Sequence, residues 1–246
     1  MSAQSKGSRG FTLVELVMAI AVGLVLLAAV WTAVWSGQRS SVGIERKVTT
    51  NQDTRTALDM MGMEIRMASF NSLFTANIWR NPSDCSISAN QTYKGIQEAT
   101  DTSITVEMDT EMPTPSGTCG DTDNEIVRYA YDSANSRITR ESITCIGGVR
   151  SAANALTFLG PIVGQPDVRT VVVTNGTLPV FRYFNGTGAP LNPTGTPMTS
   201  AQIPNIRRIE IVLLVESADV DPSTGQPRRM AYSTSVVPRN HGITGF

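Results

Sequence analysis

Residues 11–35 read FTLVELVMAIAVGLVLLAAVWTAVW, and this stretch decides the fold. Its apolar run extends from Leu16 to Trp35, and only Gly23 and Thr32 interrupt it. A helix of that length, rising about 1.5 Å per residue, crosses a hydrocarbon core of about 30 Å. Because apolar side chains lie all round such a helix, the stretch predicts a membrane span or a helix within a bundle.

The carboxylate of Glu15, the fifth residue of this stretch, is unusual in a membrane segment. On insertion scales an acidic residue at the centre of a membrane helix costs roughly 2.5–3.5 kcal/mol. The sequence therefore predicts a partner for this charge. The alternative is an incidental charge that is solvated at the headgroup level, because Glu15 lies near one edge of the apolar run.

A cleaved secretory signal is the competing interpretation of the N-terminus, with Ala28-Ala29 or Ala33 near the cut. The apolar region of such a signal normally spans about 7–15 residues, which is shorter than this run. The acidic residue at the start of the run is a second argument against it. A retained anchor is therefore favoured, with Trp31 and Trp35 at the membrane interface.

Proline divides the chain into two parts. The first 81 residues contain none, and all 13 prolines fall at or after Pro82. Because a proline in a helix interior costs about 3 kcal/mol, this distribution predicts one long helix followed by a different structure. A stripe at three- and four-residue spacing predicts that the helix continues to about Ala68 and packs one face on a sheet. The stripe consists of Leu58, Met61, Ile65 and Ala68.

Two further features belong to the second half of this helix. Met60, Met63 and Met67 are expected to widen its apolar surface, and a core role is favoured over a binding role. Residues 49–56 are mostly polar, so we expect the helix to be solvated there or to touch another subunit.

Short alternating segments separated by turn residues predict an antiparallel, β-rich head domain over residues 71–246. The fold class is thus α+β, with a long N-terminal helix packed on the head. Residues 125–131 and 137–143, joined by residues 133–136, make the clearest hairpin, and residues 186–204 are expected to form a long surface loop. Further strands are expected at 103–107, 171–173, 180–184, 206–215 and 232–237.

The N-terminus resembles the class III leader of type IV prepilins and type II secretion pseudopilins. The matching features are a short basic leader, Gly10 before the cut, Phe11 as the new N-terminus and Glu15 as the fifth mature residue. The resemblance implies that a prepilin peptidase cleaves between Gly10 and Phe11. It also implies that the same enzyme methylates the amino group of Phe11.

The same resemblance implies where the protein resides and what it meets. Residues 1–10 would be a cleaved leader, residues 11–35 the transmembrane half of the helix and residues 36–70 its periplasmic half. The head would lie in the periplasm, and after assembly in a pilus at the cell surface. In the family, the carboxylate at the position of Glu15 meets the positively charged N-terminus of a neighbouring subunit. Expected partners are other minor pilins, the major pilin, the prepilin peptidase, the assembly platform and the inner membrane.

Several pieces of the head resemble the PilW family of minor pilins and its type II secretion counterpart, the GspJ pseudopilins. The pieces are the helix end at 59–68, the hairpin at 125–140, the aromatic strand at 181–188, and the segments 206–214 and 236–240. The resemblance implies a minor pilin that helps to initiate pilus assembly and sits at or near the tip. A GspJ-like pseudopilin and a pilus-displayed adhesin are the alternatives.

Three cysteines, Cys85, Cys119 and Cys145, suit an oxidising compartment and allow at most one internal disulfide. If Val127 faces Arg140 in the hairpin, Cys119 and Cys145 come close to opposite positions at its base. We therefore predict a Cys119–Cys145 disulfide, with Cys85–Cys119 as the rival pairing.

An acidic stretch precedes the hairpin. We interpret it as a solvated loop rather than a calcium site, because its spacing fits no EF-hand loop. No metal or cofactor is therefore predicted. The stretch consists of Asp109, Glu111, Asp121, Asp123 and Glu125.

Enzymatic and nucleic-acid functions find little support in the sequence. His241 is the single histidine, and the chain contains no phosphate-binding or nucleophile-elbow motif. A net charge of −1 offers no electrostatic footprint for nucleic acid. We therefore predict a non-catalytic protein without a nucleic-acid partner.

Overall fold

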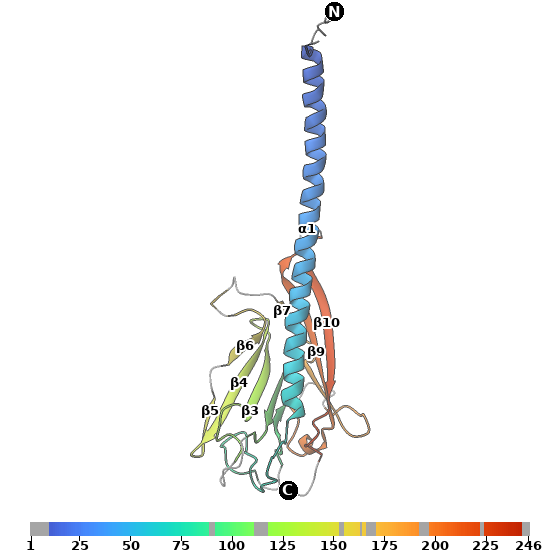
Figure 1. Ribbon diagram of the computed structural model, residues 1–246. Helices are drawn as coiled ribbons and strands as arrows, with labels where there is room; N and C mark the ends of the chain where they lie inside the picture. The colour runs from blue at the N-terminus through green and yellow to red at the C-terminus, as the bar shows by residue number, and fades with distance from the viewer. Residues whose placement is uncertain are drawn as a thin grey trace, which may run out of the picture.

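The computed structural model shows one long helix followed by two antiparallel sheets (Figure 1). This arrangement confirms the predicted α+β, pilin-like fold. The residues that the structure describes are 10–88, 92–110, 118–152, 155–162, 164–165, 171–191, 197–221 and 224–242.

The helix α1 (Leu13–Arg66) runs without a break for 54 residues. Its first half stands clear of the head, and its second half lies against the sheets (Figure 1). It ends at the C-cap Met67, one residue before the predicted end. Gly43 is the first buried residue of the helix. An added Cβ there would lie 3.4 Å from Asp221 Oδ1, so the missing side chain lets the helix approach the head closely.

The first sheet contains six strands among the described residues, in the order β1-β2-β3-β4-β5, with β6 also paired to β4. The predicted strand at 103–107 and the predicted hairpin are present as β2 and as β3 with β4. Strands β1, β5 and β6 were not predicted. The strands are β1 (Ile96–Ala99), β2 (Ser103–Glu107), β3 (Ile126–Asp132), β4 (Arg137–Ile146), β5 (Val149–Ala152) and β6 (Leu156–Leu159).

The second sheet contains four described strands, in the order β10-β9-β7, with β8 also paired to β9. Every second residue of β9 is buried along most of its length, which is the alternation that predicted this strand. A short 3₁₀ helix (Ile203–Asn205) overlaps the end of the predicted loop at 186–204, and residues 192–196 of the loop lie outside the described part. The strands are β7 (Val171–Val173), β8 (Phe181–Phe184), β9 (Arg208–Val220) and β10 (Pro227–Val236).

The apolar stripe of α1 forms the centre of the core. Leu58, Met61, Ile65 and Ala68 are all buried, as predicted. The helix packs against β9, β10 and β7 of the second sheet and against β6 of the first. One helical face therefore holds the two sheets together.

The expectation for the methionines of α1 is wrong in part, and the expectation for residues 49–56 holds for only part of that stretch. Met60 and Met63 are 38% and 55% exposed, and only Met67 of the three methionines packs against the core. Met63 lies two residues, or about 200° around the helix, from the buried Met61, so it points away from the sheets. Thr50 and Thr54 are buried rather than solvated. Thr54 Oγ1 donates to the Thr50 carbonyl at 2.7 Å, which satisfies this hydroxyl inside the helix.

The register of the β3–β4 hairpin differs from the predicted one by two residues. Tyr129 pairs with Arg140, whereas the prediction placed Val127 opposite Arg140. The loop has four residues, because Asp132 and Arg137 close it with an ion pair of 3.0 Å. A shift of two keeps every side chain on its predicted face, because side chains alternate with a period of two.

Candidate assembly site

Two residues three positions apart hold the start of α1. Thr12 is the N-cap, and its Oγ1 accepts a hydrogen bond of 3.3 Å from the backbone N–H of Glu15. In return, Glu15 Oε2 accepts hydrogen bonds of 3.0 Å from the Thr12 backbone N–H and of 3.0 Å from the Thr12 hydroxyl. The two residues form a capping box, which satisfies donors that a helix start otherwise leaves unpaired.

This local role for Glu15 was not predicted from the sequence. The signal was present, since Thr12-Leu13-Val14-Glu15 has the T-x-x-E spacing of a capping box. Both hydrogen bonds from Thr12 go to Oε2, and Oε1 accepts none from the described residues. The carboxylate thus has one oxygen engaged within the chain and one oxygen open to a donor from outside it.

Gly10 and Phe11, on either side of the expected cleavage point, precede α1 in the chain and are exposed. Phe11 is 88% exposed, and nothing lies within 4 Å of the position that a Cβ on Gly10 would occupy. The junction between them is therefore accessible to another protein. Residues 1–9 of the expected leader lie outside the described part of the chain.

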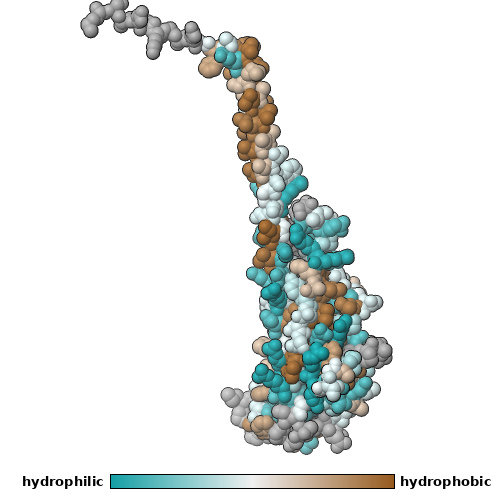
Figure 2. Space-filling model, turned by 90° about the vertical axis from the view of Figure 1, so that its right-hand side faces the viewer, coloured by the Kyte–Doolittle hydropathy of each residue, from teal (hydrophilic) through white to brown (hydrophobic). Residues whose placement is uncertain are grey.

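The apolar run of α1 has no cover within the described chain. From Leu16 to Trp35 every residue is exposed except the partly buried Gly23. Figure 2 shows this as a largely hydrophobic shaft above a head whose visible surface is mostly hydrophilic. Among the described helices, α1 is long and apolar enough to cross a membrane. An apolar surface of this size needs lipid or other helices around it.

A family model described as the prokaryotic N-terminal methylation motif matches residues 5–31. The chain carries a prepilin-type N-terminal methylation motif. The matched residues include the Gly10–Phe11 junction and Glu15. Together with the apolar helix α1, the motif fits anchoring in a membrane. No curated protein and no solved structure matches the chain.

A buried polar network attaches the C-terminal end of α1 to the first sheet. Tyr129 donates a hydrogen bond of 2.6 Å to Glu64 Oε2, and Arg140 forms an ion pair of 2.8 Å with Glu64 Oε1. Arg140 also donates to Asn124 Oδ1 at 3.0 Å. Both sheet residues reach one carboxylate because they are directly opposite each other in the β3–β4 register. The C-terminal end of α1 is therefore fixed to the head, and the exposed N-terminal half of the helix projects from it.

The disulfide joins Cys85 to Cys145, so the predicted Cys119–Cys145 pairing is wrong, and so is the rival Cys85–Cys119 pairing. Cys119 is a buried free thiol that packs with Ile78 and Trp79. Its neighbour Gly120 occupies the place beside Cys145: the Gly120 carbonyl accepts a hydrogen bond of 2.6 Å from the Cys145 backbone N–H. The thiol of Cys119 therefore points into a different cluster.

The acidic stretch is only partly a solvated loop. Asp109 and Glu125 are buried, and Glu125 accepts hydrogen bonds from the backbone N–H groups of Gly120 at 2.9 Å and of Thr110 at 3.3 Å. Its carboxylate thus organises the loop before β3. Glu111 lies outside the described residues. Within the described ranges no three His, Cys, Asp or Glu side chains are grouped to hold a metal ion.

His241 is buried, although it lies close to the C-terminus. Its Nε2 lies 2.8 Å from the Ile203 carbonyl, and its Nδ1 lies 2.7 Å from the Lys94 carbonyl. Burial lowers the pKa of this imidazole. The ring joins the C-terminal segment to the 3₁₀ helix and to the residue before Gly95, which is a structural role.

Glu107 on β2 is a buried carboxyl of the head. It is fully buried, its Oε2 accepts a hydrogen bond of 3.0 Å from the Arg80 backbone N–H, and its Oε1 has no hydrogen-bond partner among the described atoms. Burial raises the pKa of this group to about 8. The carboxyl is therefore mostly protonated in the folded protein at neutral pH.

Proposed function

We propose that this chain is a minor pilin, similar to PilW, that helps to initiate assembly of a type IV pilus and is incorporated at or near its tip. The observation that carries the proposal is Glu15 at the head of an uncovered apolar helix, inside a matched methylation motif. A carboxylate in that position is costly in a lone membrane helix and is stabilised by a cation from a neighbour.

Processing is the first step of the proposed function. A prepilin peptidase at the inner membrane cleaves between Gly10 and Phe11 and methylates the new amino group. The exposure of Phe11 and the open space at Gly10 support this, because the enzyme must surround the bond that it cuts. The product keeps Thr12 and Glu15, so the capping box remains after cleavage.

Assembly is the second step. Glu15 Oε2 is engaged by Thr12, and Oε1, which accepts no hydrogen bond from the described residues, receives the methylated ammonium group of an adjacent subunit. In a membrane of low dielectric constant this ion pair is much stronger than in water. The pair favours one axial offset between subunits, and the exposed apolar run packs against the helices of those neighbours.

The head supports the assignment to minor pilins through the segments that resemble PilW. They include the helix end with Glu64, the β3–β4 hairpin and the strand β9, and these contribute to the core that holds the helix. The partners in this proposal are other minor pilins, the major pilin, the prepilin peptidase, the assembly platform and the inner membrane. The head lies on the periplasmic side.

Mass analysis of the N-terminus of membrane-extracted protein tests the processing step. We expect the chain to begin with N-methylated Phe11. Gly10→Glu is expected to block cleavage, whereas Gly7→Glu adds the same charge within the leader and leaves cleavage intact. A native chain that begins at Met1, or one trimmed beyond Trp35 and released from the membrane, contradicts the proposal.

The assembly role needs a cellular test. Deletion of this chain is expected to reduce surface pili and to leave type II secretion unchanged, and the wild-type chain restores pili. Labelled antibody against the head is expected at filament ends. Loss of secretion with normal pili would instead indicate a GspJ-like pseudopilin. Normal pili with loss of attachment to a surface would indicate a displayed adhesin.

A further inference from the structure

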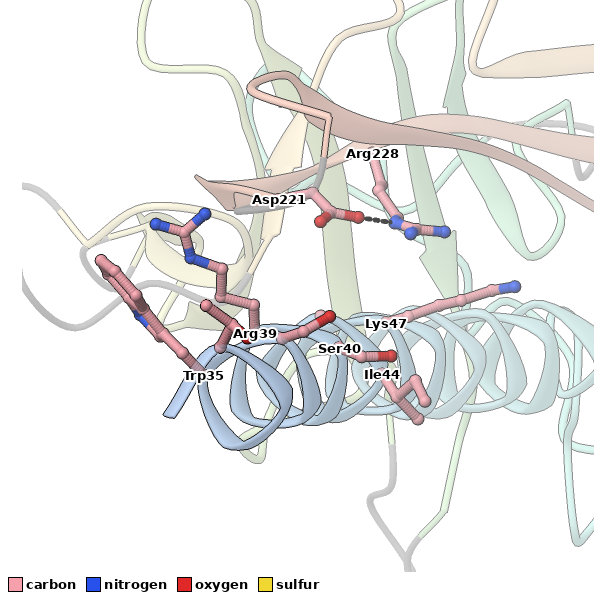
Figure 3. Close-up of a pocket in the computed structure, with 10 residues that line it drawn as sticks. Trp35, Arg39, Ser40, Ile44, Lys47, Asp221 and Arg228 are labelled. Atoms are coloured by element: carbon pink, nitrogen blue, oxygen red, sulfur yellow. Dashed lines mark hydrogen bonds and ion pairs between the residues drawn. The ribbon is translucent and has the colours of Figure 1, made fainter. Parts of the chain in front are cut away.

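A cavity of about 570 Å³ lies where α1 leaves its apolar run, between the helix and the residues Asp221 and Arg228. Figure 3 shows the helix on one side and Asp221 with Arg228 on the other. Small residues on one helical face, Ser36, Ser40 and Gly43, leave this space open. The cavity therefore has two causes. Gly43 lets the helix approach Asp221 closely, and the small side chains of Ser36 and Ser40, on the membrane side of Gly43, leave space unfilled.

The charges around the cavity do not balance. Arg228 and Asp221 form an ion pair and offset each other. Arg39 lies with its guanidinium 4.5 Å from the centre of the Trp35 ring, and neither Arg39 nor Lys47 pairs with a described carboxylate. Figure 3 shows Arg39 rising from the helix toward the turn that carries Asp221. The cavity thus keeps an excess of positive charge beside two hydroxyl-bearing residues.

The position of the cavity relative to the membrane indicates which group neutralises its excess positive charge. Trp35 ends the apolar run, and tryptophan is typical of the membrane interface. Arg39 lies one helical turn further, about 6 Å along the axis. The headgroup layer extends about 5–8 Å beyond the hydrocarbon core on each side. The Arg39 guanidinium is therefore placed in the headgroup layer when the apolar run spans the membrane.

We infer that this cavity binds the phosphate of an anionic phospholipid. Arg39 contacts the phosphate, and Ser36 and Ser40 offer hydroxyl donors. The acyl chains lie along the exposed apolar surface of α1. This inference rests on the proposed membrane anchorage of the chain. It gives the subunit a preference for anionic lipid at the point where the head meets the bilayer.

Lipid retention by the full-length chain tests the inference. The protein is reconstituted in vesicles of phosphatidylcholine with phosphatidylglycerol as a minor component, released in mild detergent, and analysed by native mass spectrometry. The wild type is expected to retain phosphatidylglycerol in preference to phosphatidylcholine. Arg39→Gln is expected to lower that retention about fivefold, which corresponds to about 1 kcal/mol for one cation at an anionic surface.

Arg55→Gln is the matched control, because Arg55 is exposed on the same helix and does not line the cavity. It should leave retention unchanged. Equal loss in both variants, or no loss in Arg39→Gln, would overturn the inference. Complete displacement of phosphatidylglycerol by excess inorganic phosphate would also overturn it, because the site would then take free phosphate. Failure of the wild type to enter vesicles of phosphatidylcholine alone would contradict the proposed anchorage instead.

Discussion

Tyr129 on β3 and Glu64 on α1 are joined by a hydrogen bond of 2.6 Å across the helix–sheet boundary. Arg140, opposite Tyr129 on β4, binds the same carboxylate. The network ties together three elements that are distant in sequence. It stabilises the contact between the C-terminal part of α1 and the head, from which the exposed part of the helix projects.

We expect Tyr129→Phe to lower the free energy of unfolding by about 1.5–3 kcal/mol, because it removes a buried hydrogen bond to a charged group. Chemical denaturation of the full-length protein in a neutral detergent measures this. Tyr232→Phe is the control, since among the described residues the Tyr232 hydroxyl donates to the weak acceptor Met230 Sδ, and it should change stability by less than about 0.5 kcal/mol. Equal effects of the two variants would show that the hydrogen bond to Glu64 contributes little.

The two roles of Glu15 can be separated by substitution. Glu15→Gln keeps a side-chain oxygen for the capping box and removes the charge. We expect it to insert and mature normally but to reduce recovery of the chain in sheared filaments, as Glu15→Ala should. Thr12→Val keeps the charge and weakens the helix start by about 1 kcal/mol, so it should reduce recovery less. Thr12→Ser, which keeps the cap, is its control.

The opposite ranking would change the interpretation of Glu15. If Glu15→Gln assembles like the wild type while Thr12→Val does not, the carboxylate acts through the helix cap alone. The ratio of mature chain in the filament fraction to mature chain in the membrane fraction distinguishes these outcomes.

The disulfide predicts a clear order among cysteine variants. Cys85→Ser and Cys145→Ser should each lower the free energy of unfolding by about 2–4 kcal/mol, because the bridge closes a long loop. Cys119→Ala should cost no more than about 1 kcal/mol. Peptide mapping without reduction should recover Cys85 linked to Cys145. A linked peptide that contains Cys119 would contradict the observed pairing.

The thiol of Cys119 should also resist modification. Burial raises the pKa of this thiol, so the reactive thiolate is scarce in the folded protein. We expect an alkylating reagent to label Cys119 only after denaturation. Mass spectrometry of the intact protein measures this directly. Rapid labelling under native conditions would show that this part of the head opens.

Stability should fall with rising pH because of Glu107. Its pKa is about 8 in the folded protein and about 4.5 in the unfolded chain, so the folded state binds the extra proton between those values. The contribution is fully present below about pH 4.5 and is lost as the pH rises through about 8. The fall is at most about 1.4 kcal/mol per pH unit within that window.

Glu107→Gln should flatten this dependence, because an amide does not titrate. Melting temperatures of both proteins between pH 5.5 and pH 8.5, with steps of about one unit, test the difference. Glu141→Gln on the partly exposed face of β4 is the control and should keep the wild-type slope. Parallel curves for the wild type and Glu107→Gln would contradict the raised pKa.

Much of the fold was predictable from local patterns. The proline distribution separated helix from head, the stripe from Leu58 to Ala68 identified the buried helical face, and alternation located β2, β3, β4 and β9. These features repeat within a few residues, so each is visible in the segment that forms it.

The disulfide and the burial of Thr50 and Glu107 were not predictable in this way. Cys85 and Cys145 are 60 residues apart, and their meeting depends on how the loop before β3 folds around Gly120. Thr50 and Glu107 are polar, and they become buried only because other elements cover them. The residue pattern within one segment does not predict contacts with a distant segment.

The sequence alone determined the N-terminal motif, the length of the apolar run and the position of Glu15, because these depend on residue type and spacing along one helix. Only the tertiary structure decided the disulfide, the network around Glu64 and the cationic cavity between Arg39 and Asp221. Each of these unites residues from elements that are distant in the chain. Their distances follow from packing of the whole head against α1, which spacing within a segment does not specify.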